Sequence, residues 1–438
     1  MSRKNDFSRA ISEWFTSNIP EIKNRDMELP ENIPVITSII GPRRSGKTYL
    51  MYKLIKKLLN KIPKYNILYI NFENEYLINL DARDLDDLLE SYYEIAKPDF
   101  NNPVYLFFDE IQVVRNWNLW INKIYETKKY HIYLTGSSSK LLSRELSTEL
   151  RGRSIDFLVF PLSFKEFLEF NNFSIEKPGM YIKSPERGKI INYLNEYLKY
   201  GGFPEICLMH SNKEKLLKSY ADTMVIKDVG ERFHIEPSIL NVFFNYCISL
   251  YSKYFTGNKT YNYLKSLNFK ISHDLPNQLL YDFTEVFSIF KIDIYSKSNK
   301  SKNQYPKKIY IVDSGIINIK SDNYNIGRLM ENTVFLDLEK KSESMNLFNI
   351  YYWKQYGKSE GLEVDFVIYK NSVKFLINIT YASSYDEINK RELKSIIKAS
   401  EELKCNRNII ITWDYYENKD NIEFIPLWYW LLNDYKIL

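Results

Sequence analysis

Eight consecutive residues near the amino end of the chain have the types and the spacing that hold a phosphate group. Gly41 and Gly46 enclose four residues, and Lys47 and Thr48 follow directly. The glycines let the backbone wrap closely, so that successive N–H groups can point at phosphate oxygens. In this pattern the lysine reaches the β- and γ-phosphates, and the hydroxyl binds Mg²⁺. The pattern predicts a nucleotide site made of these eight residues and of the tyrosine that follows them: Gly41, Pro42, Arg43, Arg44, Ser45, Gly46, Lys47, Thr48 and Tyr49.

A second signal is the pair Asp109 and Glu110, which ends an apolar run that begins at Val104. A buried strand that delivers two carboxylates to its carboxyl end is typical of NTPases that hold a metal ion and a water molecule there. We expect Asp109 to hold Mg²⁺ together with Thr48, and Glu110 to be the general base, with Lys47 as a further catalytic residue. The alternative is two solvated carboxylates at the start of a loop, which the upstream phosphate loop disfavours.

Hydroxyl residues and arginines follow in the same region. Thr135 and Ser137 end an apolar run that begins at His131, and they could sense the γ-phosphate or cap the helix that follows. Arg153, with Arg151 as second choice, is the candidate for a guanidinium that stabilises transition-state charge, often across a subunit interface. A surface ion pair is the alternative that the sequence leaves open for Arg153.

These residues need a scaffold that brings them to one edge. Apolar, β-branched runs predict five buried strands at 33–40, 67–72, 104–110, 131–139 and 155–160. Helical spacing follows the phosphate loop over 49–59. Strands that alternate with helices predict a parallel α/β sheet, which binds ligands at the carboxyl ends of its strands.

Composition sets broad limits. Lys and Arg exceed Asp and Glu by 60 to 55, a net charge of +5 that permits a nucleic-acid partner without arguing for one. The three cysteines, Cys207, Cys247 and Cys405, suit neither a disulfide framework nor a zinc site, which favours the cytoplasm. No run approaches about eighteen apolar residues, so we expect no membrane span, and we expect no signal peptide either.

From residue 237 onward the pattern changes to three helices and a hairpin, which suggest a winged helix. The predicted wing is rich in lysine and poor in acid, and it suits phosphate contacts on duplex DNA. The lysines in question are Lys297, Lys300, Lys302, Lys307 and Lys308. A solvated lysine loop, or a winged helix that binds protein, are the open alternatives.

Five segments in this order resemble a prokaryotic, archaeal and bacterial, family of AAA-type P-loop ATPases: GPRRSGKT, LFFDEIQ, YLTGSSSKLL, LRGRSIDFLVFPLSFKEFL and YGGFPE. Members typically carry a carboxyl-terminal domain of unknown function that ends in a restriction-endonuclease-like fold. The resemblance implies ATP rather than GTP as the nucleotide. It also implies a winged helix, and a small helical lid that contains the YGGFPE turn.

The resemblance gives an expectation for the last part of the chain as well. A restriction-endonuclease-like site needs an Asp and then a Glu-x-Lys on the next strand, which bind a metal ion and activate water. Glu331 and Asp365 stand at positions that look like the acidic ones of the family, whereas Asn378 and Thr380 replace the Glu and the Lys. We therefore expect a degenerate site that does not cleave, in a domain that serves as a scaffold or holds DNA.

The expected fold class is α/β, a P-loop NTPase parallel sheet with a helical lid, a winged helix and a C-terminal α/β nuclease-like domain. The expected boundaries are 1–32 for an N-terminal helix and lead-in, 33–175 for the P-loop ATPase core, 176–236 for the lid, 237–305 for the winged helix and 306–438 for the nuclease-like domain.

The expected function is Mg²⁺-dependent ATP binding and hydrolysis, coupled to DNA binding or remodelling. The alternative is a nucleotide-dependent signalling switch that acts on a protein partner without DNA. The partners to consider are therefore ATP, duplex DNA, a protein and a second copy of the chain. What the hydrolysis would drive is not written in the motifs.

Overall fold

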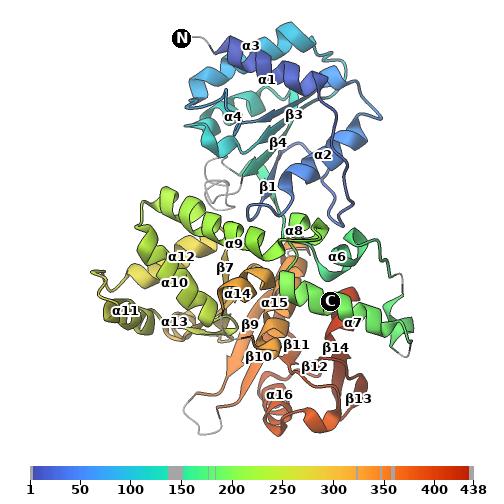
Figure 1. The fold of residues 1–438 in the computed structure, drawn as a ribbon, viewed down its shortest axis with the longest axis vertical. Coiled ribbons are helices and arrows are strands. Elements are labelled where there is room, and N and C mark those ends of the chain that lie inside the picture. Colours follow the sequence, from blue (N-terminus) through green and yellow to red (C-terminus); the bar gives the residue numbers. More distant parts are fainter. Residues whose placement is uncertain are drawn as a thin grey trace. The chain divides into compact units, whose positions relative to one another are not determined.

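The computed structural model describes residues 3–136, 150, 152–175, 177–182, 184–321, 324–345, 348–356 and 361–433. The chain forms two compact units, residues 1–159 and 160–438 (Figure 1). The predicted ATPase core of 33–175 thus reaches into the second unit, and the other predicted boundaries stay predictions. Among the described helices, none is long and apolar enough to cross a membrane.

The first unit is built on a five-stranded parallel sheet, as predicted. Its strands are β1 Ile36–Ile40, β2 Ile67–Asn71, β3 Val104–Asp109, β4 Tyr130–Gly136 and β5 Ser154–Leu158, in the order β2-β3-β4-β1-β5. All neighbours pair in parallel. Strands β1 to β4 are mostly buried, which explains why they are apolar runs rather than alternating ones, whereas the edge strand β5 is only partly buried.

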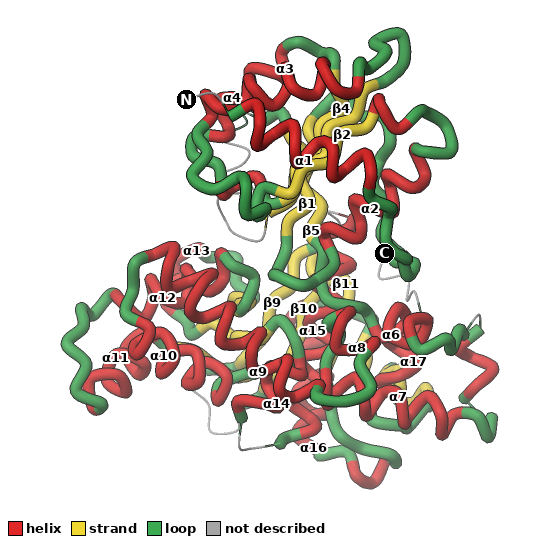
Figure 2. The backbone as a smooth tube through the Cα atoms, turned by 45° about the horizontal axis from the view of Figure 1, so that its top comes forward, coloured by secondary structure: helices red, strands yellow, loops and turns green. Residues whose placement is uncertain are grey.

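Helices surround this sheet (Figure 2). They are α1 Lys4–Thr16, α2 Lys47–Leu58, α3 Leu85–Ala96 and α4 Trp117–Glu126. Helix α1 packs against α3 and β2 with its residues Phe7, Ala10, Ile11 and Trp14 buried. That spacing is the apolar stripe of an amphipathic helix. The indole Nε1 of Trp14 donates a hydrogen bond to the Ile67 carbonyl at 2.7 Å and fixes α1 beside the start of β2.

The register of the sheet brings the predicted site to one edge. Ile40, the last residue of β1, pairs with Gly136 at the end of β4 and with Leu158 at the end of β5. Asn71 pairs with Asp109, so β2 and β3 end together as well. Strand β4 lies between β1 and β3. Thr135 therefore emerges between the phosphate loop and the Asp109–Glu110 pair.

The second unit contains a nine-stranded mixed sheet in the order β13-β14-β12-β11-β10-β9-β7-β8-β6. These strands are β6 Lys253–Phe255, β7 Ile289–Ile294, β8 Lys307–Ile311, β9 Asn349–Lys354, β10 Glu363–Lys370, β11 Ser372–Ile379, β12 Asn408–Thr412, β13 Glu417–Lys419 and β14 Ile422–Pro426. The helices are α6 Phe164–Phe170, α7 Arg187–Tyr200, α8 Pro204–Leu208, α9 Lys213–Thr223, α10 Pro237–Ser249, α11 Gly257–Ser266, α12 Leu275–Glu285, α13 Asn299–Gln304, α14 Ser314–Lys320, α15 Ile326–Met345, α16 Lys390–Leu403 and α17 Leu427–Leu432. A π-helical segment, Met224–Glu231, joins α9 to the region of α10.

Residues 237–311 form what we call the helix–hairpin region. Helices α10, α11 and α12 pack together, and the rings of Phe244 and Phe283 stack at 5.2 Å. The expected hairpin of β7 and β8 is present, and the short strand β6 extends it because it pairs with β8 on the other side. The three helices and the hairpin follow the order that the sequence predicts.

Residues 326–433 follow as α15, the antiparallel strands β9, β10 and β11, then α16 and β12, which is parallel to β11 (Figure 1). A core of buried residues lies between α16 and the sheet, and it includes Val364, Leu376 and Ile396. Strand β7 joins this part to the helix–hairpin region, because it pairs with β9 at Asp293 and Ile294.

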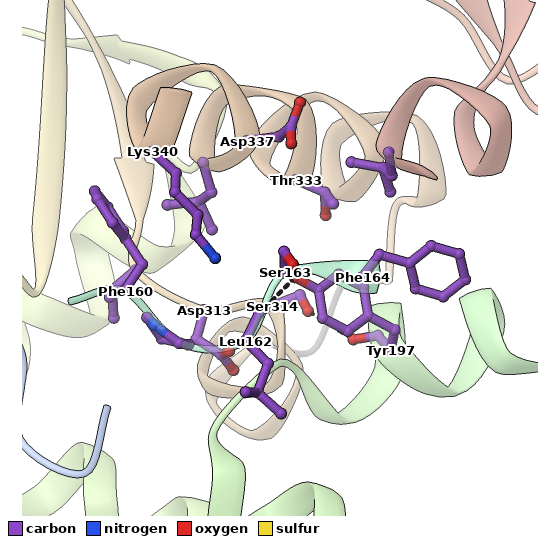
Figure 3. A pocket seen from close by; sticks show the side chains of 14 residues that line it. Phe160, Leu162, Ser163, Phe164, Tyr197, Asp313, Ser314, Thr333, Asp337 and Lys340 are labelled. Carbon is purple, nitrogen blue, oxygen red and sulfur yellow. Dashed lines mark hydrogen bonds between the residues drawn. The ribbon is translucent and has the colours of Figure 1, made fainter. Parts of the chain in front are cut away.

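The Gly201–Gly202 turn between α7 and α8 is held by a buried carboxylate, Asp313. The Gly202 N–H donates to Asp313 Oδ2 at 2.7 Å, and the Gly315 N–H donates to Oδ1 at 2.8 Å. Figure 3 shows Asp313 beside Leu162, whose N–H donates to the Gly202 carbonyl at 2.7 Å. Burial raises the pKa of Asp313 to about 7. The two glycines of the YGGFPE segment therefore allow close packing inside the second unit.

We predict that Gly201→Ala destabilises the protein by at least about 2 kcal/mol. Gly201 has φ +77°, and an added Cβ would lie 1.8 Å from Asp313 Oδ1. Gly188→Ala, on α7, is the matched control, because its Cβ would meet nothing within 4 Å. The control should change stability by no more than about 1 kcal/mol. Urea unfolding measures both, and equal effects of the two substitutions would contradict the role given to the turn.

Candidate functional site

The phosphate loop follows β1 and leads into α2, as its sequence predicts. Gly41 has φ +138°, and a Cβ there would lie 2.4 Å from the Val159 carbonyl oxygen. Gly46, with φ +99°, precedes the first residue of α2. Gly41 is therefore required by a close approach of the backbone, and Gly46 is required by its left-handed backbone conformation. The loop ends at the amino end of a helix, where the helix dipole favours an anion.

The Lys47 side chain lies along the inside of this loop. Its Nζ donates hydrogen bonds to the Gly41 carbonyl at 3.1 Å and to the Pro42 carbonyl at 3.0 Å. Lys47 is buried. An ammonium group with neutral carbonyl partners can exchange them for phosphate oxygens, which are stronger acceptors.

Two arginines support the loop, and one of them was not predicted. Arg25 is buried, and its Nη1 donates to the Ser45 carbonyl at 2.8 Å. Lys53 on α2 in turn donates to the Arg25 carbonyl at 2.6 Å. Arg43 forms an ion pair with Glu73 at 3.2 Å. Arg25 lies in a polar lead-in with no periodic pattern, so the sequence carries no signal for this contact.

Asp109 is the centre of the site. Thr48 Oγ1 and the Tyr69 hydroxyl each donate to Asp109 Oδ2 at 2.8 Å, and Thr135 donates to Oδ1. The carboxylate is almost fully buried. Burial, and then the neighbouring Glu110 charge, raise its pKa, while the three hydroxyl donors act to lower it. Three strands and the phosphate loop thus converge on one carboxylate.

Glu110 continues directly from β3. It has a left-handed backbone, φ +54°, and its N–H donates to Thr135 Oγ1 at 2.9 Å. Its carboxylate accepts a hydrogen bond from the Gln112 side chain. Thr135 therefore links Asp109 and Glu110. Ser137, the other predicted sensor, lies outside the described residues.

Tyr69 is the residue at this centre that the sequence analysis missed. The strand 67–72 was predicted, but its alternation does not separate Tyr69 from its neighbours, because the strand is buried on both faces. Tyr49, predicted to belong to the nucleotide site, is half-exposed beside the loop and packs edge-to-face with Tyr52.

Arg153, the candidate finger, lies far from the phosphate loop of its own chain. The Ile36 N–H donates to the Arg153 carbonyl at 2.8 Å, so Arg153 stands at the amino end of the sheet. The phosphate loop starts at the carboxyl end, about 16 Å away along five strand residues. The guanidinium pairs with Glu126 and donates to Asn122 Oδ1 at 3.2 Å. Within its own chain Arg153 is a surface ion pair, the alternative considered for it, and Arg151 lies outside the described residues.

The lysines predicted to bind DNA from the hairpin differ in their exposure and contacts. Lys297 and Lys300 are exposed, and Lys302 Nζ lies 3.4 Å from the Tyr351 hydroxyl. Lys307 is tied to Asp293 at 2.5 Å. Lys308 is buried and cannot touch a DNA phosphate in this arrangement, so its assignment to the wing surface is wrong. The alternation along β8 explains the error, because neighbouring residues of a strand face opposite sides.

The expected nuclease-like positions gather around Lys308. Its Nζ lies 2.9 Å from Glu331 on α15 and 2.8 Å from Asp365 on β10. Glu363, two residues before Asp365 and on the same face of β10, lies 3.0 Å from it. This period of two could have identified Glu363 from the sequence. Burial raises the pKa of Glu331 to about 8, and the Asp365 charge acts in the same direction.

Asn378 and Thr380 do not complete a metal site. Asn378 Oδ1 accepts from the Asp365 N–H at 3.1 Å, and Nδ2 donates to Glu392 at 2.8 Å. Thr380 follows the end of β11, and its N–H donates to the Ile411 carbonyl. No group of three or more His, Cys, Asp or Glu suited to a metal ion is found among the residues that the structure describes.

We predict that Tyr69→Phe destabilises the protein by about 1–2 kcal/mol at alkaline pH, and by less at acidic pH. The hydroxyl stabilises charged Asp109, whose folded-state pKa is already raised by burial. Without this hydroxyl group the pKa of Asp109 rises further, because only the charged form loses a stabilising hydrogen bond. The loss of folding free energy therefore disappears as falling pH protonates Asp109.

Tyr105→Phe is the matched control for that measurement. The Tyr105 hydroxyl donates to the neutral Asn32 Oδ1 at 2.7 Å, in the same unit. Its removal should cost about 1 kcal/mol at both pH values. Denaturant unfolding at the two pH values checks this, and a Tyr69→Phe effect that does not vary with pH would contradict the assignment.

Family models match the chain in three blocks. An AAA domain matches residues 34–168, which include the phosphate loop, Asp109, Glu110 and Thr135. A domain of unknown function, DUF8612, matches residues 191–324. A second one, DUF4143, matches residues 326–430. The predicted P-loop ATPase domain of AAA type is confirmed.

Solved structures with a related arrangement have low scores. The Orc1 protein of Aeropyrum pernix in complex with DNA has a TM-score of 0.31 at 10% identity, and covers 75% of this chain and 93% of its own. Cdc6p of Pyrobaculum aerophilum has a TM-score of 0.26 at 11% identity, with 76% and 93% covered. At these scores the likeness identifies no function.

Relatives match along nearly the whole chain. An uncharacterized protein of Haemophilus influenzae is 29% identical over 408 residues, 91% of this chain and 94% of that protein. The uncharacterized protein MJ1544 of Methanocaldococcus jannaschii is 38% identical over 429 residues, 94% of this chain and 91% of that protein. The chain, in which an AAA-type P-loop ATPase domain precedes two domains of unknown function, therefore belongs to the family of MJ1544.

Proposed function

We propose that the first unit binds ATP together with Mg²⁺ and hydrolyses the γ-phosphate bond. The observation that carries this proposal is the buried Asp109 carboxylate, which joins Thr48 of the phosphate loop to Thr135 of β4. A loop with glycine-specific geometry ahead of a helix supplies the anion site. The match to an AAA domain over the same residues supports nucleotide binding.

The residues at this centre fit Mg²⁺. Thr48 Oγ1 and Asp109 Oδ2 lie 2.8 Å apart, and both are hard oxygen donors of the kind that Mg²⁺ prefers. When bound, the ion would neutralise charge on the phosphates and on the buried Asp109 carboxylate. Thr48 and Asp109 are therefore the proposed holders of the ion. Lys47 would exchange its carbonyl partners for phosphate oxygens.

Glu110 is the proposed general base. It follows Asp109 directly, and its backbone is fixed by Thr135, so its carboxylate starts from a defined point at the edge of the sheet. A carboxylate so placed can accept a proton from an attacking water molecule. Thr135 is proposed as a sensor that couples this base to the carboxylate of the metal site.

Two further assignments depend on a nucleotide or a second chain. Tyr49 is proposed to contact the nucleotide from its half-exposed position beside Thr48. Arg153 lies at the far end of its own sheet, so we propose a finger role for it only toward the nucleotide of a second copy of the chain. Such a role would require the guanidinium to leave Glu126.

We further propose that hydrolysis is coupled to DNA binding through the helix–hairpin region, as a winged helix. Its order of three helices and a hairpin, and the exposed Lys297 and Lys300, support this assignment. The region that follows, with its nuclease-like order of elements, is proposed to be a scaffold without cleavage, because Asn378 and Thr380 replace the required Glu and Lys.

We predict that duplex DNA raises the ATPase rate several-fold and that Glu110→Gln lowers kcat by about 100-fold or more, in line with removal of a general base. Steady-state phosphate release measures both, with and without DNA. Glu94→Gln on α3 is the control, because the same chemical change occurs at an exposed glutamate that pairs with Lys4.

Other outcomes of this assay are informative. Slow turnover that DNA does not change would contradict the coupling to DNA, and would favour a switch that acts on a protein partner. Full activity of Glu110→Gln would contradict its assignment as the base. Binding of a fluorescent ATP analogue, which should survive this substitution, separates a defect in chemistry from a defect in the nucleotide site.

We predict that Lys297→Ala with Lys300→Ala lowers the salt dependence of duplex binding. The slope of log K against log salt should fall by about 0.9 for each phosphate that these lysines no longer neutralise. Lys189→Ala with Lys394→Ala removes the same charge from exposed positions on α7 and α16. Fluorescence anisotropy at several salt concentrations compares the pairs. An equal effect of both pairs would mean that general charge, and not the hairpin, binds the DNA.

A further inference from the structure

A single ammonium group fills the acidic cluster of the second unit. Lys308 Nζ lies 2.8 Å from Asp365, 2.9 Å from Glu331 and 3.0 Å from Glu363. The Lys308 side chain is 2% exposed. Three carboxylates from α15 and β10 therefore contact one ammonium group, which comes from β8 of the helix–hairpin region, and only Glu363 among them also contacts a second ammonium group, that of Lys354 at 3.3 Å, among the ion pairs of the described residues.

This arrangement does not fit the metal ion that a nuclease-like site would hold. The oxygens that converge in the cluster are the ones that Lys308 already contacts, Glu331 Oε1, Glu363 Oε1 and Asp365 Oδ1. Asp365 Oδ2 accepts from the Ile379 N–H at 3.0 Å. Glu331 Oε1 also accepts from the Tyr310 hydroxyl at 2.9 Å. A divalent ion would have to displace the ammonium group to reach these oxygens.

The backbone of Lys308 cannot move aside easily. Strand β8 is hydrogen-bonded on both sides, to β6 and to β7, and Lys308 pairs with Tyr254 on one side and Ile292 on the other. The ammonium group is thus held in the cluster by an inner strand. A buried charge in such a place is costly unless it is paired, and here the pairing is threefold.

We infer that Lys308 is a built-in counter-ion that stands in the place of a divalent metal ion in the nuclease-like site, and that it fastens the helix–hairpin region to α15 and β10. A lysine side chain and a metal ion have the same electrostatic effect here, because each neutralises converging carboxylates. The lysine cannot be exchanged or carry a water molecule for attack, so the cluster becomes a structural link. This link does not depend on ATP.

The test is a Mn²⁺ titration followed by thermal unfolding and by electron paramagnetic resonance. Lys308→Met should lower the Tm, because three carboxylates lose the buried ammonium group that they share. Added Mn²⁺ should restore several degrees of that decrease in Lys308→Met and should not change the wild-type Tm through this site. Lys308→Met with Asp365→Asn should lose the restoration. Lys354→Met is the matched control, because Lys354 contacts Glu363 at 3.3 Å while Lys308 stays in place, so it should gain no response to Mn²⁺.

Two results would overturn the inference. One is a wild-type Mn²⁺ site that Asp365→Asn removes, which would mean that the cluster binds metal beside the lysine. This comparison needs no Lys308 variant, so it stands even where Lys308→Met fails to fold. The other is a folded Lys308→Met that gains no Mn²⁺ site. All compared chains differ only in the second unit, so any Mn²⁺ bound at Asp109 contributes equally to each of them. A negative result in this experiment would therefore not contradict the proposed ATPase function.

Discussion

The desolvation of a carboxylate is the constraint on which the first unit depends. Asp109 lies at the end of a fully buried strand, where a charge is tolerated only with strong hydrogen-bond donors. Its donors come from β2, from β4 and from the start of α2. The sheet order is what allows this, since β4 must lie between β1 and β3 for Thr135 to reach Asp109. The strand order of the fold and the geometry of the site therefore depend on each other.

Sequence reasoning recovered this unit because each element carries its own signal. Buried parallel strands are apolar runs, and Gly41 and Gly46 stand where a Cβ would collide or strain the backbone. Tyr69 and Arg25 were not predicted from the sequence, for a physical reason. Their roles arise only when distant segments meet, one across two strands and one from the lead-in to the loop. The sequence also could not show that Arg153 stands at the amino end of the sheet, because a motif gives position along the chain but not which end of a strand it occupies.

The second unit was predicted less completely, and Lys308 shows why. In sequence it belongs to a run of lysines that suits a DNA-binding hairpin. In the structure strand alternation turns it inward, while Lys307 pairs with Asp293 near the surface. Its three carboxylate partners lie between 23 and 57 residues further along the chain. No local pattern could have joined them.

The two carboxylate centres differ in how their charge is balanced. The donors to Asp109 are hydroxyl groups, which satisfy its oxygens but bring no positive charge. A centre of that kind favours an exchangeable cation, as a hydrolytic site requires. Glu331, Glu363 and Asp365 instead receive a cation that is covalently part of the chain. A permanent counter-ion stabilises the contact between two regions but removes the vacancy that metal chemistry needs. The same physical demand is thus met in two ways, at the proposed hydrolytic site of one unit and at the proposed structural link of the other.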